Sequence, residues 1–183
     1  FNSKDTNKHL CTVTGALWTP QGRKFDGVDD LINCGTSDTL RQTGAQSMFA
    51  WINPTSWDGS PGIIGRGALG SGSLVNAGIG LWLSTLGVLQ FQTNDGVTSS
   101  NTASYTLALN TWSFIGFSWN GTTNAGGLIF FNNGNSDSSV ACPVASIIAN
   151  PGDDNFFKLG RRVSGGAYFT GTIGEALHYS RAL

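Results

Sequence analysis

The sequence has few charged residues. Only 11% of its 183 residues are Asp, Glu, Lys or Arg, well below the roughly 25% of an ordinary globular chain. Glutamate occurs once, at Glu175. The 10 basic and 11 acidic residues nearly balance, which leaves a formal charge of −1. The basic excess that attracts nucleic acid is therefore missing, and we expect no nucleic-acid partner.

Long apolar segments are missing too. No run of about 18 apolar residues occurs, so the sequence predicts no membrane insertion. The first ten residues read FNSKDTNKHL, without an apolar stretch or an initiating Met, and do not form a signal peptide. We expect residues 1–183 to form a single domain that is part of a longer polypeptide or assembly.

Cysteine is scarce, and its spacing excludes a common type of metal site. Cys11, Cys34 and Cys142 form no CxxC pair and have little histidine nearby, so a zinc site is not expected. Two alternatives stay open. All three can be buried thiols, or one disulfide can form, for which Cys11–Cys34 is the better pairing.

Small polar residues and glycine fill the place of the missing charges. Asn, Ser and Thr together occupy 52 positions and glycine another 26. This composition is poor in helix formers and rich in strand and turn formers. It argues against a helical bundle or a coiled coil.

Apolar and polar residues alternate with a period of two along most of the chain, which predicts strands. Turn sequences such as Asn120-Gly121 separate them. About a dozen short strands with this spacing indicate an all-β, two-sheet antiparallel β-sandwich or jelly roll. The expected strands are 11–17, 30–34, 47–53, 62–66, 79–84, 88–93, 103–107, 112–119, 128–132, 156–160, 168–173 and 175–179.

The six tryptophans could stack on sugars, but a tryptophan inside a strand more often fills the core. Trp57 differs because it lies in a predicted loop, where ligand contact and loop anchoring are both open. Loops on a rigid sandwich are suited to binding. The candidate ligand contacts are Trp57, Asp58, Asn76, Asn94 and Asp95.

The residues needed for hydrolytic catalysis are not paired in the sequence. Glycosidases commonly use two carboxylates, yet no predicted strand carries acidic residues two or four apart on one face. The only candidate general bases of the imidazole type are His9 and His178. We therefore expect no catalytic residues and no enzymatic activity.

An ordered set of short phrases resembles one family. The phrases are 25–30 (FDGVDD), 31–35 (LINCG), 50–54 (AWINP), 80–83 (GLWL), 109–112 (LNTW), 119–122 (WNGT), 130–134 (FFNNG), 159–162 (LGRR), 171–175 (GTIGE) and 179–183 (YSRAL). From about Trp18 onward the chain resembles the laminin-G-like, concanavalin A-like jelly-roll domains of bacterial and viral surface proteins. The resemblance implies two antiparallel sheets packed face to face.

The turn at residues 26–30 concentrates carboxylates, which calcium prefers as ligands. The resemblance implies that Glu175 runs close to this turn. We therefore expect a structural Ca²⁺ held by Asp26, Asp30 and Glu175. Gly174 departs from the family, which often has an aspartate there. In the alternative, the Asp side chains only accept hydrogen bonds within their own turn.

These features predict a non-catalytic extracellular recognition or adhesion module that binds glycans or a surface partner through its loops. The alternative is a structural subunit or decoration domain of a virion, pilus or other extracellular filament, which packs against copies of itself. Fold alone does not decide between them.

Overall fold

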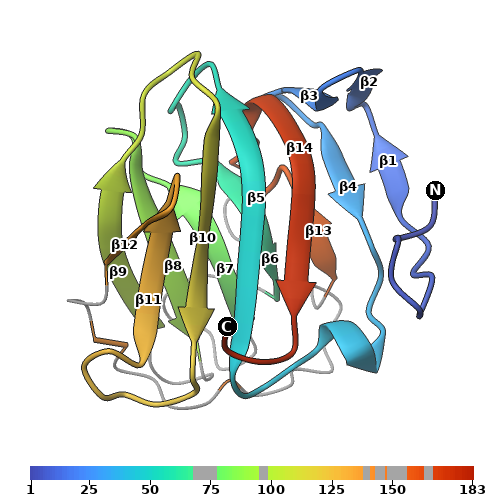
Figure 1. Ribbon diagram of the computed structural model, residues 1–183. Coiled ribbons are helices and arrows are strands. Elements are labelled where there is room, and N and C mark those ends of the chain that lie inside the picture. Colours follow the sequence, from blue (N-terminus) through green and yellow to red (C-terminus); the bar gives the residue numbers. More distant parts are fainter. Residues whose placement is uncertain (68–77, 95–98, 138–140, 143–146, 148–155, 163–166) are drawn as a thin grey trace.

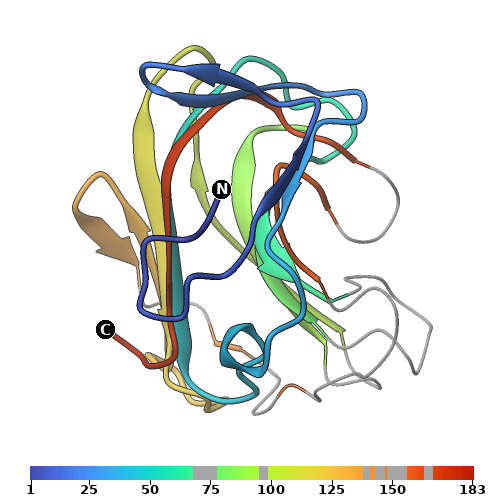
Figure 2. The same cartoon turned by 90° about the vertical axis from the view of Figure 1, so that its right-hand side faces the viewer.

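The computed structural model describes residues 1–183 except for 68–77, 95–98, 138–140, 143–146, 148–155 and 163–166. Two seven-stranded antiparallel sheets pack face to face (Figures 1 and 2). The described residues contain one 3₁₀ turn, η1 (Asp38–Leu40), and no α-helix. This confirms the predicted all-β sandwich. No helix in this part of the chain is long and apolar enough to cross a membrane.

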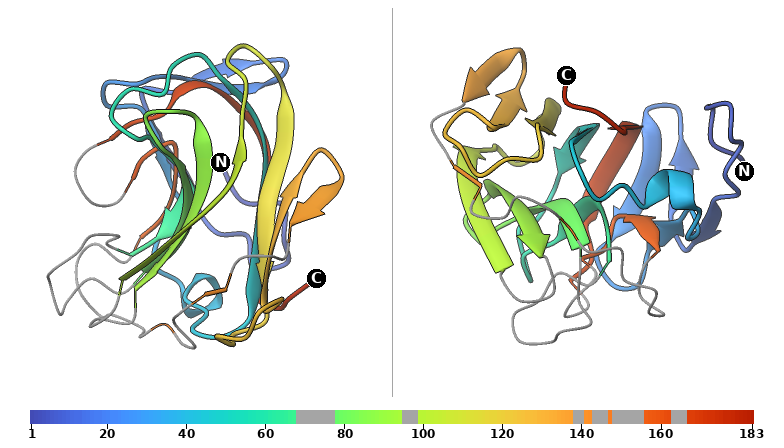
Figure 3. Two further views of the ribbon diagram at one scale, coloured as in Figure 1. Left: turned by 90° about the vertical axis from the view of Figure 1, so that its left-hand side faces the viewer. Right: turned by 90° about the horizontal axis from the view of Figure 1, so that it is seen from below.

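Each sheet combines strands from distant parts of the chain. Sheet I has the order β1 (Thr12–Thr14), β4 (Leu31–Asn33), β13 (Phe157–Leu159), β6 (Gly62–Arg66), β7 (Gly78–Leu83), β8 (Val88–Asn94) and β9 (Ser99–Thr106). Sheet II has the order β12 (Asn135–Asp137), β11 (Leu128–Asn132), β10 (Ser113–Trp119), β5 (Gln46–Pro54), β14 (Thr170–Tyr179), β3 (Gly22–Asp26) and β2 (Leu17–Thr19). Both sheets bow in the same direction, so the outer face of sheet I is concave (Figure 3).

Strand alternation decides which side chains form the core. On β5, Met48, Ala50 and Ile52 are fully buried in the cluster between the sheets. Phe91 from sheet I and Phe117 from sheet II meet edge to face there, with ring centroids 4.6 Å apart. The residues between these inward positions, such as Phe49 and Trp51, therefore belong to the outer face of sheet II.

The strand prediction is right in most places and differs from the structure at β3, at β12, within residues 11–17 and within residues 168–179. The strands β6 and β11 have the predicted bounds. The strands β3 and β12 were not predicted, because each carries at most one apolar residue and no alternation. Gly15, with a φ of 70°, interrupts the predicted strand 11–17: β1 ends at Thr14, and β2 begins only at Leu17 and continues to Thr19. The predicted strands 168–173 and 175–179 form one continuous strand, β14.

No disulfide joins Cys11, Cys34 or Cys142. Cys11 and Cys34 adjoin the paired residues Thr12 and Asn33, so the two cysteines lie close together across β1 and β4. Burial, followed by the neighbouring Cys11 thiol, raises the pKa of Cys34 above its usual value. The Cys142 thiol lies 3.7 Å from the Thr93 hydroxyl.

Candidate functional site: a tryptophan-lined hollow

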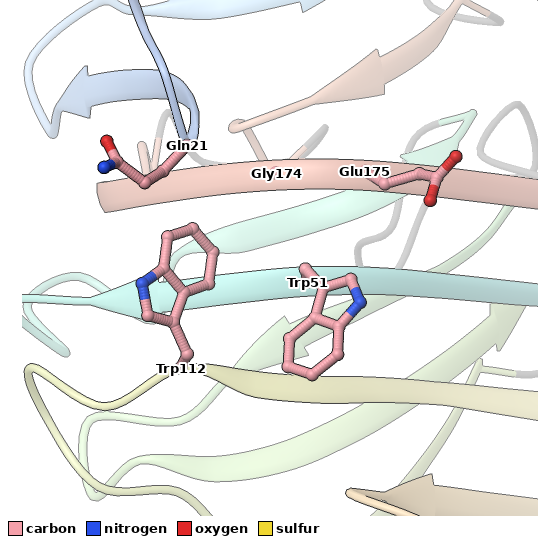
Figure 4. A pocket seen from close by; sticks show the side chains of 5 residues that line it. All are labelled: Gln21, Trp51, Trp112, Gly174 and Glu175. Atoms are coloured by element: carbon pink, nitrogen blue, oxygen red, sulfur yellow. The ribbon is translucent and has the colours of Figure 1, made fainter.

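An open hollow of about 240 Å³ lies on the outer face of sheet II. Four separate chain segments contribute to it: the β2–β3 turn, β5, the residue before β10, and the middle of β14. Figure 4 shows Gln21 and Glu175 at opposite ends of the hollow, with the two indoles alongside. The lining residues are Gln21, Trp51, Trp112, Gly174 and Glu175.

A β-bulge in β14 creates this arrangement. Ile173 pairs with Ile52 and Ala176 pairs with Ala50, so two residues of β14 lie opposite the single residue Trp51. Those two residues are Gly174 and Glu175. A bulge leaves its extra residue unpaired and redirects side chains, and bulges are common beside binding sites. The bulge thus brings the only glutamate of the sequence beside an outward-facing tryptophan.

Gly174 forms the floor of the hollow. A Cβ atom at this position would lie 3.3 Å from the Trp51 Cβ, 3.6 Å from Trp112 Cζ3 and 3.2 Å from the Gln21 carbonyl oxygen. A larger side chain would therefore occupy the space between the two indoles. The absence of a side chain at Gly174 therefore keeps the hollow open.

A row of aromatic rings supports Trp51 from one side. Its ring centroid is 5.3 Å from that of Phe114, which stacks on Phe49 at 5.6 Å with planes only 9° apart. Phe131 closes the row at 5.5 Å from Phe49. Gly116 lies beneath Phe49 and has no room for a side chain. Trp51 is still 42% exposed, so its indole is held in place while part of its surface stays open.

The charge in the hollow comes from one carboxylate. Glu175 and Gln21 are both exposed, and the other lining residues are uncharged. Within the described part of the chain, the ion pairs are His9–Asp5 at 3.4 Å and Arg41–Asp38. Glu175 belongs to neither pair. The hollow therefore combines apolar ring surface, one neutral amide and one negative charge.

This combination is suited to binding. Indole faces can pack against the apolar face of a sugar ring, while the amide and carboxylate can hydrogen-bond its polar groups. The common mechanism of glycoside hydrolysis takes two carboxyl groups about 5–10 Å apart. Only one carboxylate lines this hollow.

Of the predicted loop contacts that the structure describes, Trp57 and Asp58 lie in one loop and Asn94 lies at the end of β8. Trp57 packs against the core and over Gly87, where an added Cβ would lie 2.7 Å from the indole, so Trp57 anchors its loop. Asp58 is exposed and accepts a 2.6 Å hydrogen bond from the Ser56 hydroxyl. Asn94 ends β8, whereas Gly87 precedes the start of β8. Asn76 and Asp95 lie outside the described residues.

The predicted metal ligands are only partly assembled. Carboxylate oxygens of Asp26, Asp29 and Asp30 lie within 4.8 Å of one another. Asp30 is buried, and its Oδ2 accepts a 2.8 Å hydrogen bond from the Asp26 backbone N–H. Burial raises the pKa of Asp30, and the charges of Asp26 and Asp29 raise it further.

Glu175 is not part of this group. Thr170 pairs with Asp26, and Glu175 lies five residues further along β14, which is about 16 Å at 3.3 Å per residue. Calcium ligands lie only about 2.3–2.6 Å from the ion, so Glu175 and Asp26 cannot share one. In the alternative interpretation, the Asp side chains accept hydrogen bonds within their own turn. Such a bond is present, because Asp26 Oδ1 accepts from the Val28 N–H at 2.8 Å.

Sequence reasoning missed Trp51, Trp112 and Gln21 as site residues. Strand tryptophans were expected to fill the core, whereas the two-residue period of a strand puts Trp51 on the face opposite to Met48, Ala50 and Ile52. That period was the available signal. Nothing in the spacing showed that the β2–β3 turn carrying Gln21 would lie against the middle of β14.

The sandwich and its hollow define a lectin-like β-sandwich domain. Residues 26–183 match the laminin G family model described as the concanavalin A-like lectin/glucanases superfamily. The chain belongs to this family. No curated protein sequence matches the chain.

Solved structures with the same fold include two groups of sialidase domains. The CBM40 of the Ruminococcus gnavus IT-sialidase bound to α2,3-sialyllactose has a TM-score of 0.65 and 13% identity, and the match covers 94% of this chain and 92% of that one. The α2,6-sialyllactose complex has a TM-score of 0.64, 15% identity and coverages of 95% and 93%. Trypanosoma rangeli sialidase in complex with sialic acid has a TM-score of 0.64 and 16% identity, and 94% of this chain spans 27% of that chain.

Proposed function

We propose that this chain is a non-catalytic glycan-binding module and that the hollow on sheet II is its binding site. The observation that carries the proposal is the pair of partly exposed indoles, Trp51 and Trp112, over the glycine floor at Gly174. An amide and a carboxylate at the two ends supply directional hydrogen bonds. Concave sites with aromatic walls and a few fixed polar groups are typical of small-ligand binding.

The structural neighbours support the same class of ligand. Among them, the domains that correspond to this chain over nearly their whole length are carbohydrate-binding modules in complex with sialyllactose. A module of this kind would act on a cell or particle surface and gain strength from many copies, because a shallow site binds weakly. The extracellular location is part of this proposal.

Glycan-array screening followed by calorimetry tests the proposal. The variants Trp51→Ala and Trp112→Ala should each weaken binding about tenfold, since losing a stacked ring costs about 1–3 kcal/mol in comparable aromatic platforms. Trp18→Ala is the matched control, because Trp18 is 70% exposed and does not line the hollow. Equal binding by the wild type and both hollow variants would contradict the assignment of the site.

One observation favours the alternative role as an assembly subunit. The strand β2 is an edge of sheet II, and it exposes Leu17 and Trp18 next to its unpaired side. Exposed edge strands are templates for pairing with another chain. If copies assemble in this way, light scattering will show concentration-dependent growth in mass, and Trp18→Ala will reduce it without affecting glycan binding.

A further inference from the structure

We infer that the hollow selects glycans that carry free ammonium groups, such as glucosamine units, over neutral and acidic glycans. This inference rests on the proposed function and specifies its ligand class. It starts from the single uncompensated charge in the site and from the exposed faces of the two indoles.

Glu175 is the source of that charge. It is the only glutamate in the sequence, it is exposed, and no ion pair joins it to a cation among the residues that the structure describes. A glutamate side chain carries a negative charge near neutral pH. A ligand with a positive group can therefore meet this carboxylate without first displacing an internal partner.

The cations on the neighbouring strand β3 are directed elsewhere or lie at a distance. The Arg23 guanidinium donates a 3.4 Å hydrogen bond to the Ala16 carbonyl and lies 5.7 Å from the centre of the Phe1 ring. Lys24 pairs with Thr172, three residues before Glu175 on β14, which is about 10 Å at 3.3 Å per residue. The charge of Glu175 is therefore left for a ligand.

The indoles favour the same ligand. A cation within about 6 Å of an indole face is attracted by the ring quadrupole. The ammonium of an amino sugar that packs on Trp51 or Trp112 would gain this attraction together with that of the carboxylate. An N-acetylated sugar loses both gains, and a sugar acid is repelled by Glu175.

The opposite face of the molecule contains an internal example of this pairing. On the outer face of sheet I, the Arg162 guanidinium lies 3.8 Å from the centre of the Trp82 ring. There the chain supplies its own cation to an outward-facing indole. At Trp51 the ring partners in the described structure are uncharged, so the corresponding position is open to a cation from a ligand.

Four oligosaccharides distinguish the possibilities: a glucosamine tetramer, an N-acetylglucosamine tetramer, a neutral glucose tetramer and sialyllactose. Calorimetry with the full 183-residue chain should show the glucosamine tetramer binding about tenfold more tightly than the other two tetramers. Sialyllactose should bind most weakly. Added salt should reduce the preference for the glucosamine tetramer, since screening weakens exposed charge pairs.

Glu175→Gln is the decisive variant, because it keeps the shape of the side chain and removes the charge. It should bring the ratio between the affinities for the glucosamine and N-acetylglucosamine tetramers close to one. Asp58→Asn is the matched control, because it removes an exposed carboxylate that does not line the hollow. A melting curve for each variant confirms folding.

The outcomes separate the two proposals. If the wild type binds all tetramers equally and Trp51→Ala weakens them all, glycan binding stands and the inferred selectivity is overturned. A glucosamine preference that persists in Glu175→Gln also overturns it. If none of the four oligosaccharides binds to the wild type, the proposed function and the inference fall together.

Discussion

The outer faces of the two sheets each carry a tryptophan, and the two are used in opposite ways. Trp82 on sheet I is only 7% exposed, and the Arg162 guanidinium lies over its ring. The Arg162 guanidinium is held there by a 3.3 Å hydrogen bond to the buried Gln92 side chain. Trp51 on sheet II is 42% exposed and has ring neighbours on one side. An outward-facing indole is thus available to a ligand only where the chain does not cover it.

The largest expected difference is in stability. Trp82→Ala should lower the free energy of unfolding by about 3–4 kcal/mol, as for other buried aromatic residues, because it removes the ring and leaves Arg162 without its platform. Trp51→Ala should cost about 1 kcal/mol, since much of its surface is already in water. Urea unfolding of both variants measures the difference. Equal losses of stability in the two variants would contradict the distinction between the covered Trp82 and the open Trp51.

On the inner face of sheet II, a histidine should make the stability of the fold sensitive to acid. His178 lies three residues beyond Glu175 on β14 but packs inward, with its ring centroid 5.2 Å from that of Phe157. Burial, together with the positive charges of Arg66 and His9, lowers the pKa of His178 from 6.5 to about 4. The folded state therefore favours the neutral imidazole.

Stability should be fully present above pH 6.5 and decrease as the pH falls from 6.5 to about 4, because the unfolded chain binds the proton first. The loss amounts to at most about 3 kcal/mol. Urea unfolding across this range should show the decrease, and His178→Gln should flatten it. His9→Gln removes only a smaller contribution to the lowered pKa of His178, one that ranks after burial and Arg66, and should keep most of the decrease. An unchanged pH profile in His178→Gln would show that the imidazole does not cause the effect.

Two glycines of sheet II, Gly116 and Gly174, should respond differently to replacement by alanine. Gly116→Ala should cost about 2 kcal/mol, because its new methyl group would collide with the Phe49 ring and the Met48 carbonyl. Gly174→Ala should cost well under 1 kcal/mol, because its nearest contacts are at 3.2–3.6 Å. It should nevertheless weaken glycan binding by partly filling the hollow. Thermal melts and calorimetry separate these effects, and a large stability loss in Gly174→Ala would contradict this description of the floor.

A further expected effect concerns calcium. We expect Ca²⁺ to bind Asp26, Asp29 and Asp30 and to stabilise the fold by about 1 kcal/mol at roughly five times its Kd. The melting temperature of chelator-treated protein should rise by a few degrees when calcium is added. Asp29→Asn should abolish the rise, whereas Glu175→Gln should keep it. No rise at millimolar calcium would leave the hydrogen bonds within the turn as the role of these carboxylates.

Much of the fold was predictable because alternation is a local property. The strands β5, β6 and β11 were recognisable as short apolar runs bounded by polar and turn residues. The strands β3 and β12 carry too few apolar residues for this signal, and hydrogen bonds from neighbouring strands hold them in place. Family membership was also readable, because its phrases are short, ordered and local.

The candidate binding site was not predictable in the same way. Its residues come from distant segments, and the register between strands decides which of them lie together. Glu175 was assigned to the turn at residues 26–30, but the pairing of Thr170 with Asp26 places it about 16 Å away. The bulge that brings Glu175 opposite Trp51 is a property of two strands together and has no signature in either one. Trp57, the tryptophan that the sequence favoured, is used to anchor its loop.

The sequence by itself therefore determined the class of fold and much of the core, because these depend on patterns within single strands. The tertiary structure decided which outward indole is covered by Arg162 and which is left open above Gly174. It also decided which carboxylates lie near a common point. These outcomes depend on strand register, on one bulge and on the close approach of a turn, and such relations between distant segments arise only when the two sheets pack.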